Sequence, residues 1–162
     1  MYKRQISYNY GAGNSNRVRR AYRLLLTCSV CYAMLFCLLI QLFPGVFAAI
    51  FTSNAELLAF TKPMLRIYTL ALGLFGIQIA CQMTFTALGN AKASIIVAVM
   101  RKFILLLPLI YMMPHLYTAD LTKAVFMAEP VADVLAVAFT GVLFFFEFRK
   151  ALRAMPKSEK KS

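Results

Sequence analysis

The chain has 162 residues, of which 61% are hydrophobic and only 15% are charged. A composition this apolar, with a mean hydropathy of +0.69, excludes an ordinary soluble domain and indicates helices buried in lipid. The formal net charge of +12 does not indicate a nucleic-acid partner, because most of the cations lie near the two chain ends, where they flank apolar runs. We therefore expect the lipid bilayer and its anionic headgroups as partners of these flanks, and no nucleic acid.

Four apolar regions without charged residues divide the sequence, and the fourth continues a run that only Glu129 and Asp133 interrupt. They lie at residues 24–55, 67–91, 103–119 and 134–146. A helix needs roughly 20 mainly apolar residues to cross a bilayer, so these regions suffice for about four crossings. The sequence predicts an all-α integral membrane protein with about four transmembrane helices.

The first part of the chain is predicted to hold one loop and one crossing. Residues 1–16 are expected to form a cytoplasmic glycine-rich loop, where Gly11 and Gly13 add backbone freedom. The first crossing is expected at residues 17–43, because Pro44 and the glycine after it disfavour a continuing helix. A short amphipathic stretch follows.

The next two crossings are joined by a tight turn. The second is expected at residues 64–88 and stops at a glycine–asparagine pair, which is typical of helix ends. The third is expected at residues 93–113 and contains Arg101 and Lys102 about two turns from its start. These two cations either extend toward the membrane surface or face the bundle, and Pro108 can kink the helix.

The last crossing and the charge distribution give the expected orientation. The fourth crossing is predicted at residues 123–148, followed by a basic cytoplasmic tail at residues 149–162. Lys and Arg are concentrated at both chain ends and around the turn after the second crossing, whereas the other two connections have few. Because short cytoplasmic connections carry the positive excess, we predict a multi-pass protein of the inner (plasma) membrane with both termini in the cytoplasm.

Several motifs follow one another along the chain in an informative order. The segment ISYNYGAGN at residues 6–14, with Arg17 and Val18 after it, resembles the cytoplasmic loop after the eighth helix of the multidrug and toxic compound extrusion (MATE) family. The segments RIY, GIQ and FTALGNAKAS, which begin at Arg66, Gly76 and Phe85, look like that family's tenth helix and the turn beyond it. Arg101, Pro108, Pro114 and the segment EPVAD at residues 129–133 look like its eleventh and twelfth helices.

This resemblance implies a C-terminal fragment that covers about helices nine to twelve of a transporter built from two six-helix lobes. In the intact protein, entry of H⁺ or Na⁺ as the coupling ion would drive export of cationic amphipathic small molecules. The fragment is then not expected to transport alone, without the missing N-terminal lobe or other membrane helices. Two other interpretations stay open: a non-transporting membrane scaffold or gene remnant, and a protein similar to lipid-linked sugar flippases.

Two carboxylates in the fourth crossing are the ion-coupling candidates. Glu129 and Asp133 are four residues apart, so a helix places both on one face about 6 Å apart along its axis. A carboxylate inside a membrane is costly unless it is protonated, paired or hydrated, which suits a group that binds and releases a cation. The alternative is that Glu129 lies at the outer interface and has only a structural role.

The substrate-cavity candidates lie on the second crossing. Gln78 and Gln82 are four residues apart and can form a polar stripe, and Met83 and Phe85 can add an adaptable apolar surface. The alternatives are hydrogen bonds between helices for the amides and ordinary packing for the others. We expect no enzymatic activity, catalytic residue, metal site or cofactor, since the cysteine pair at residues 28 and 31 lies in a membrane run without a second ligand pair.

Overall fold

The computed structural model describes residues 2–155, and every regular element within that range is a helix. The helices are α1 (Tyr2–Gly11), α2 (Ser15–Leu42), α3 (Pro44–Ala49), α4 (Ala55–Tyr68), α5 (Leu72–Ala87), α6 (Ala91–Val99), the π-helical segment η1 (Met100–Leu106), α7 (Leu107–Leu116) and α8 (Leu121–Arg153). The all-α prediction is confirmed.

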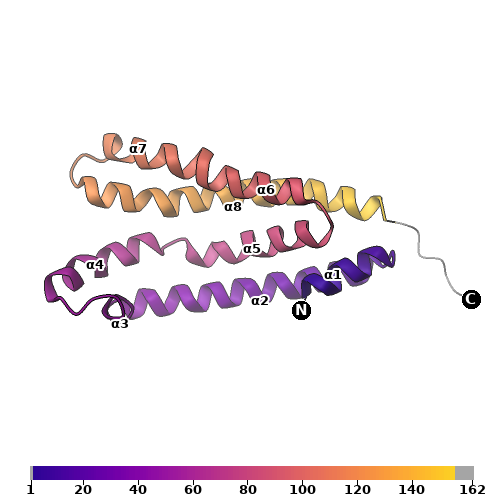
Figure 1. The fold of residues 1–162 in the computed structure, drawn as a ribbon, viewed down its shortest axis with the longest axis horizontal. Helices are drawn as coiled ribbons and strands as arrows, with labels where there is room; N and C mark the ends of the chain where they lie inside the picture. The colour runs from indigo at the N-terminus through magenta and orange to yellow at the C-terminus, as the bar shows by residue number, and fades with distance from the viewer. Residues whose placement is uncertain (1, 156–162) are drawn as a thin grey trace, which may run out of the picture.

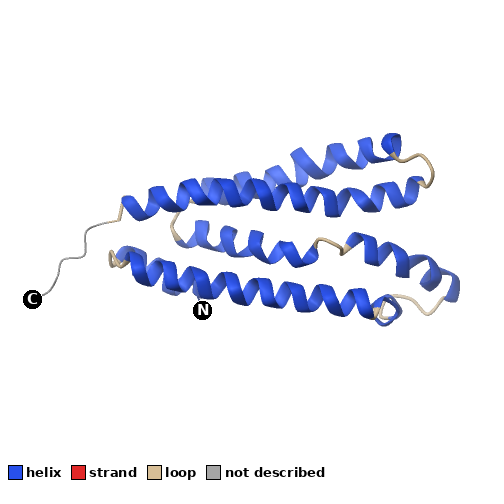
Figure 2. Ribbon diagram, turned by 180° about the vertical axis from the view of Figure 1, so that it is seen from behind, coloured by secondary structure: helices blue, strands red, loops and turns tan. Residues whose placement is uncertain are grey.

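The long helices lie side by side and run alternately in opposite directions (Figure 1). The helix α5 lies between α2 and α8 and contacts both, and α8 also contacts α4 and α7. Seen from behind, the same order recurs, and α1 together with the end of α8 lies at one end of the bundle (Figure 2).

Three helical units are long and apolar enough to cross a bilayer, and there are four if one bent pair of helices counts as a single span. Three do so singly: α2, the run Ala91–Leu116 and α8. The fourth is the pair α4 and α5, whose axes differ by 50° across a short break. Many large apolar side chains on these units are exposed, among them Phe103, Tyr111 and Phe146, as expected of surfaces that contact lipid.

The prediction of a loop at residues 1–16 is wrong, because Tyr2–Gly11 forms the helix α1. Its one fully buried side chain, Ile6, packs in a cluster with Val18 and Ala21 near the start of α2. Partly buried Tyr10 also packs against this cluster, but two apolar contacts in ten residues are too few to give a periodic pattern. Among residues 2–16, the chain is non-helical only at residues 12–14, in the turn between α1 and α2, where Gly13 has a φ of +71°.

The second crossing starts earlier than residue 64 and is broken. Asn54 caps α4, because its side-chain oxygen accepts hydrogen bonds from the amides of Glu56 and Leu57. The break after Tyr68 leaves backbone carbonyls without their usual helical donors. Side chains of α2 bind two carbonyls at this break, although the Thr69 carbonyl also accepts from the Leu72 amide at 3.0 Å.

These two bonds come from the C-terminal half of α2. Gln41 Nε2 donates to the Arg66 carbonyl at 2.8 Å, and Cys37 Sγ donates to the Thr69 carbonyl at 3.4 Å. Broken backbone at membrane depth persists only where neighbouring groups supply such partners. The break is therefore built into the contact between α2 and the second crossing.

The end of α8 also differs from the prediction. The helix continues to Arg153, so residues 149–153 of the predicted tail are its last turn, with Lys150 and Arg153 near its negative end. Residues 156–162 of the predicted tail lie outside the described residues. The third crossing extends to Leu116 and is interrupted by η1, which the sequence did not indicate.

Candidate functional site

The candidate site is a cluster of opposite charges between the third and fourth crossings. Arg101 Nε donates to Asp133 Oδ1 at 2.6 Å, and Arg101 Nη2 donates to Glu129 Oε1 at 2.9 Å. The exposed fractions of the three side chains are 14% for Arg101, 10% for Glu129 and 7% for Asp133. One guanidinium thus bridges the two carboxylates that the sequence placed on one helix face.

An aromatic ring of the second crossing also contacts this site. The ring of Phe75 on α5 lies under the guanidinium, with Arg101 Cζ 4.6 Å from the ring centroid. A cation over an aromatic face is attracted by the ring quadrupole. The side chain of Arg101 therefore contacts two other helices, α8 and α5.

The π-helical segment η1 determines where Arg101 points. In η1 the amide of Leu107 donates to the carbonyl of Lys102, five residues earlier, instead of four. Pro108 follows directly and has no amide to donate, so the regular ladder is disturbed at this point. The wider turn carries Arg101 toward α8 while Lys102, 52% exposed, remains near the surface.

Charge is nearly balanced within the cluster. Lys102 Nζ lies 3.7 Å from the same Glu129 oxygen that binds Arg101, so two cations face two carboxylates. Paired charges are tolerated inside a membrane far better than isolated ones. Chemically, a cation that replaced the guanidinium would meet two carboxylates on successive turns of α8.

The substrate-cavity candidates do not converge on one surface. Gln78 is 3% exposed and its Oε1 has no partner among the described atoms, whereas Gln82 Nε2 donates to the Ser94 carbonyl at 3.4 Å. Met83 is 45% exposed on the outside of the bundle, and Phe85 is fully buried in a core cluster with Phe144. Of the four, Gln78 alone presents an unpaired polar atom to the interior.

The sequence analysis did not include Arg101 among the candidate site residues. A usable signal existed, because one cation two turns inside an apolar run faces two acids in the next run. Opposite charges in adjacent crossings of a bundle lower the cost of burial by pairing. By contrast, no sequence pattern indicated the π-helical segment η1, which contains Arg101.

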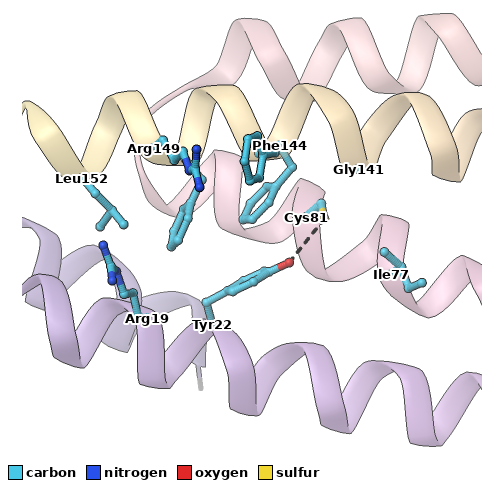
Figure 3. Close-up of a pocket in the computed structure, with 10 residues that line it drawn as sticks. Arg19, Tyr22, Ile77, Cys81, Gly141, Phe144, Arg149 and Leu152 are labelled. Carbon is cyan, nitrogen blue, oxygen red and sulfur yellow. Dashed lines mark hydrogen bonds between the residues drawn. The ribbon is translucent and has the colours of Figure 1, made fainter.

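A second feature lies at the end of the bundle that holds α1 and the end of α8. A pocket of about 440 Å³ opens between α2, α5 and α8, and Figure 3 shows the residues around it. Within it the Tyr22 hydroxyl and Cys81 Sγ are 3.7 Å apart in a hydrogen bond. The ring of Tyr22 stacks on that of Phe144, with centroids 4.6 Å apart.

Comparison with known proteins agrees with this fold. No curated protein matches the chain. One solved structure, described as an inward-facing conformation of a multidrug resistance MATE family transporter of the MOP superfamily, matches with a TM-score of 0.85 at 17% sequence identity. The match covers 94% of this chain but 35% of that chain, so the chain spans about a third of that transporter's length.

The family itself is shown by the sequence. The model of the MatE family matches residues 5–112, which is more than half of the chain. This match confirms the resemblance that the motifs indicated, and it favours the drug-exporter interpretation over the flippase interpretation. The chain is a membrane-embedded protein that belongs to the MatE (MATE) family.

Proposed function

We propose that these helices form part of the second lobe of a secondary active transporter that exchanges H⁺ or Na⁺ for cationic amphipathic molecules. The observation that carries the proposal is the buried cluster of Arg101, Glu129 and Asp133 in a chain of this family. In this proposal the protein lies in the plasma membrane with both ends of the chain in the cytoplasm, the side that its basic flanks favour.

The coupling step exchanges one cation for another at the two carboxylates. In the conformation described here Arg101 occupies them, and in the other conformation the guanidinium withdraws and H⁺ or Na⁺ takes its place. The ion drives transport because it binds one conformation better than the other. A π-helical turn supports such a movement, since its backbone hydrogen bonds can shift register over a short distance.

The transport activity is proposed for a longer assembly than these four crossings. The support is that the match covers only 35% of the solved transporter chain, which is therefore about three times as long as the matched part. Alternating access in transporters built from repeats requires one half to move against the other. The 162-residue chain alone is then expected to insert into the membrane without moving substrate.

Efflux of ethidium from a pump-deficient bacterium tests the proposal. The chains to compare are the 162-residue chain, the reading frame extended upstream, and the extended chain with Asp133→Asn. The matched control is Asp120→Asn in the extended chain, because Asp120 is an exposed acid outside the cluster.

The proposal predicts efflux from the extended chain and its control, and loss of efflux in Asp133→Asn. Membrane insertion, measured on the same cells by quantitative immunoblotting, must be equal. Efflux that survives Asp133→Asn would reject the role of the cluster in coupling. Absence of efflux from every inserted chain would favour the non-transporting scaffold.

A further inference from the structure

The pocket at the basic end of the bundle has the composition of a lipid site. Its inner wall consists of apolar and aromatic side chains from α5 and α8, with Ile77 and Gly141 at one end (Figure 3). Arg19 on α2 and Arg149 on α8 lie at the other end, with Leu152 between them (Figure 3). An apolar slot with cations at only one end matches a molecule with an anionic head and a hydrocarbon tail.

The cations at this end have no acidic partners in the described part of the chain. The ion pairs found among residues 2–155 involve Arg101, Lys102 and Lys123, and none includes Arg19 or Arg149. The nearby acid Glu147 accepts a hydrogen bond from Asn90 Nδ2 at 2.8 Å. The two guanidinium groups are therefore available to an anion from outside the chain.

A second cavity extends the basic region along α8. It has a volume of about 550 Å³ and shares Phe145 and Arg149 with the first, and Lys150 and Arg153 also line it. The guanidinium of Arg149 lies 3.8 Å from the centroid of the Phe145 ring, which fixes the cation between the two cavities. An apolar slot thus passes directly into a cluster of three cations.

We propose that an anionic phospholipid binds here, with its phosphate between Arg19 and Arg149 and part of one acyl chain in the slot between Tyr22 and Gly141. Arginine suits a phosphate because its planar donors form paired hydrogen bonds. The acyl chain would cover the apolar side chains that line the slot, and burial of apolar surface is favourable. The lipid would fasten the end of α8 to α2, independently of transport.

Native mass spectrometry of the purified 162-residue chain in detergent tests this site. The probes are dioleoyl phosphatidylglycerol, zwitterionic dioleoyl phosphatidylcholine, and glycerol phosphate, which has the anionic head without a tail. The charge variant is Arg19→Gln with Arg149→Gln. Its matched control is Arg17→Gln with Arg20→Gln, which removes two exposed cations of the same end that do not line the pocket.

A third variant fills the slot without a change of charge. A Cβ built at Gly141 meets no atom within 4 Å, so Gly141→Leu adds a side chain to the pocket wall without a clash at its Cβ. Leucine also favours a helix more than glycine does, which guards against simple misfolding. Circular dichroism checks the helix content of every variant.

The proposal predicts that the anionic lipid binds about tenfold more weakly to the charge variant and to Gly141→Leu, and less than about twofold more weakly to the control pair. Glycerol phosphate at the same concentration should not displace the lipid. Equal losses in the charge variant and the control pair would overturn the site, because the attraction would then be general. Unchanged binding to Gly141→Leu would overturn the placement of the acyl chain.

Discussion

Arg101 Nε donates to Asp133 Oδ1 over 2.6 Å and so joins the π-helical segment of the third crossing to the middle of α8. Because the same guanidinium also binds Glu129, α8 is tied to the third crossing at two successive turns. Both the stability of the bundle and the proposed exchange of cations depend on this link.

Removal of either partner of the link should destabilise the bundle. Asp133→Asn leaves Arg101 with one carboxylate, and Arg101→Gln leaves two facing carboxylates, so each is expected to cost about 3 kcal/mol of unfolding free energy. The double variant should cost less than the sum of the single variants, because no unpaired charge of that pair remains. Thermal unfolding in detergent measures the cycle, and additive losses would mean that the two residues act independently.

The close approach of α2 and α5 depends on Gly76. A Cβ at this position would lie 2.6 Å from the Ser29 carbonyl oxygen and 2.9 Å from Val30 Cα, both backbone atoms that cannot easily move. Gly76→Ala should therefore lower the unfolding free energy by about 2 kcal/mol.

Gly141→Ala is the matched control for that substitution. A Cβ there meets nothing within 4 Å, so the gain in helix propensity should make it neutral or stabilising by up to about 1 kcal/mol. Chemical denaturation of both variants in detergent compares them. Equal effects of the two substitutions would show that α2 and α5 do not approach as described.

Asn90 holds the turn between the second and third crossings. Its side-chain oxygen accepts from the Ala93 amide at 3.1 Å and its amide nitrogen donates to Glu147 at 2.8 Å, so it caps α6 and binds α8 at once. Asn90→Ala should lower the unfolding free energy by about 2 kcal/mol. Asn14→Ala is the control, because Asn14 makes no side-chain bond at the start of α2, and it should change stability far less.

Asp120 gives the chain a pH-sensitive helix start. The amide and ammonium groups of Lys123 lower the pKa of Asp120 below its ordinary value of 3.8, chiefly through the backbone hydrogen bond of 3.0 Å. A lowered pKa in the folded state means that the stabilising contact is complete above pH 3.8 and is lost as the pH falls through the folded value. Carbon NMR of the carboxyl group should give a midpoint below 3.8, and a midpoint at or above that value would contradict the cap.

The sequence predicted the parts of the site that depend on spacing within one helix. Glu129 and Asp133 share a face of α8 because residues four apart always do so in a regular helix. The crossings could be located for the same reason, since length and apolar content decide whether a helix can span a bilayer.

The features that escaped prediction depend on contacts between helices. At the break after Tyr68, Gln41 and Cys37 on another crossing bind the carbonyls of Arg66 and Thr69. The helix α1 owes its place to the burial of Ile6 against α2, and the turn of Arg101 toward α8 owes its direction to a change of hydrogen-bond register. None of these leaves a periodic pattern in the residues.

Cation movement in proteoliposomes tests the exchange of Arg101 for a coupling ion most directly. The chain extended upstream is reconstituted, ethidium is added on one side, and internal dyes record the H⁺ or Na⁺ that moves in response. The account predicts cation movement with the unchanged chain and the Asp120→Asn control, and none with Asp133→Asn, although ethidium still binds. Cation movement of undiminished size with Asp133→Asn would contradict it.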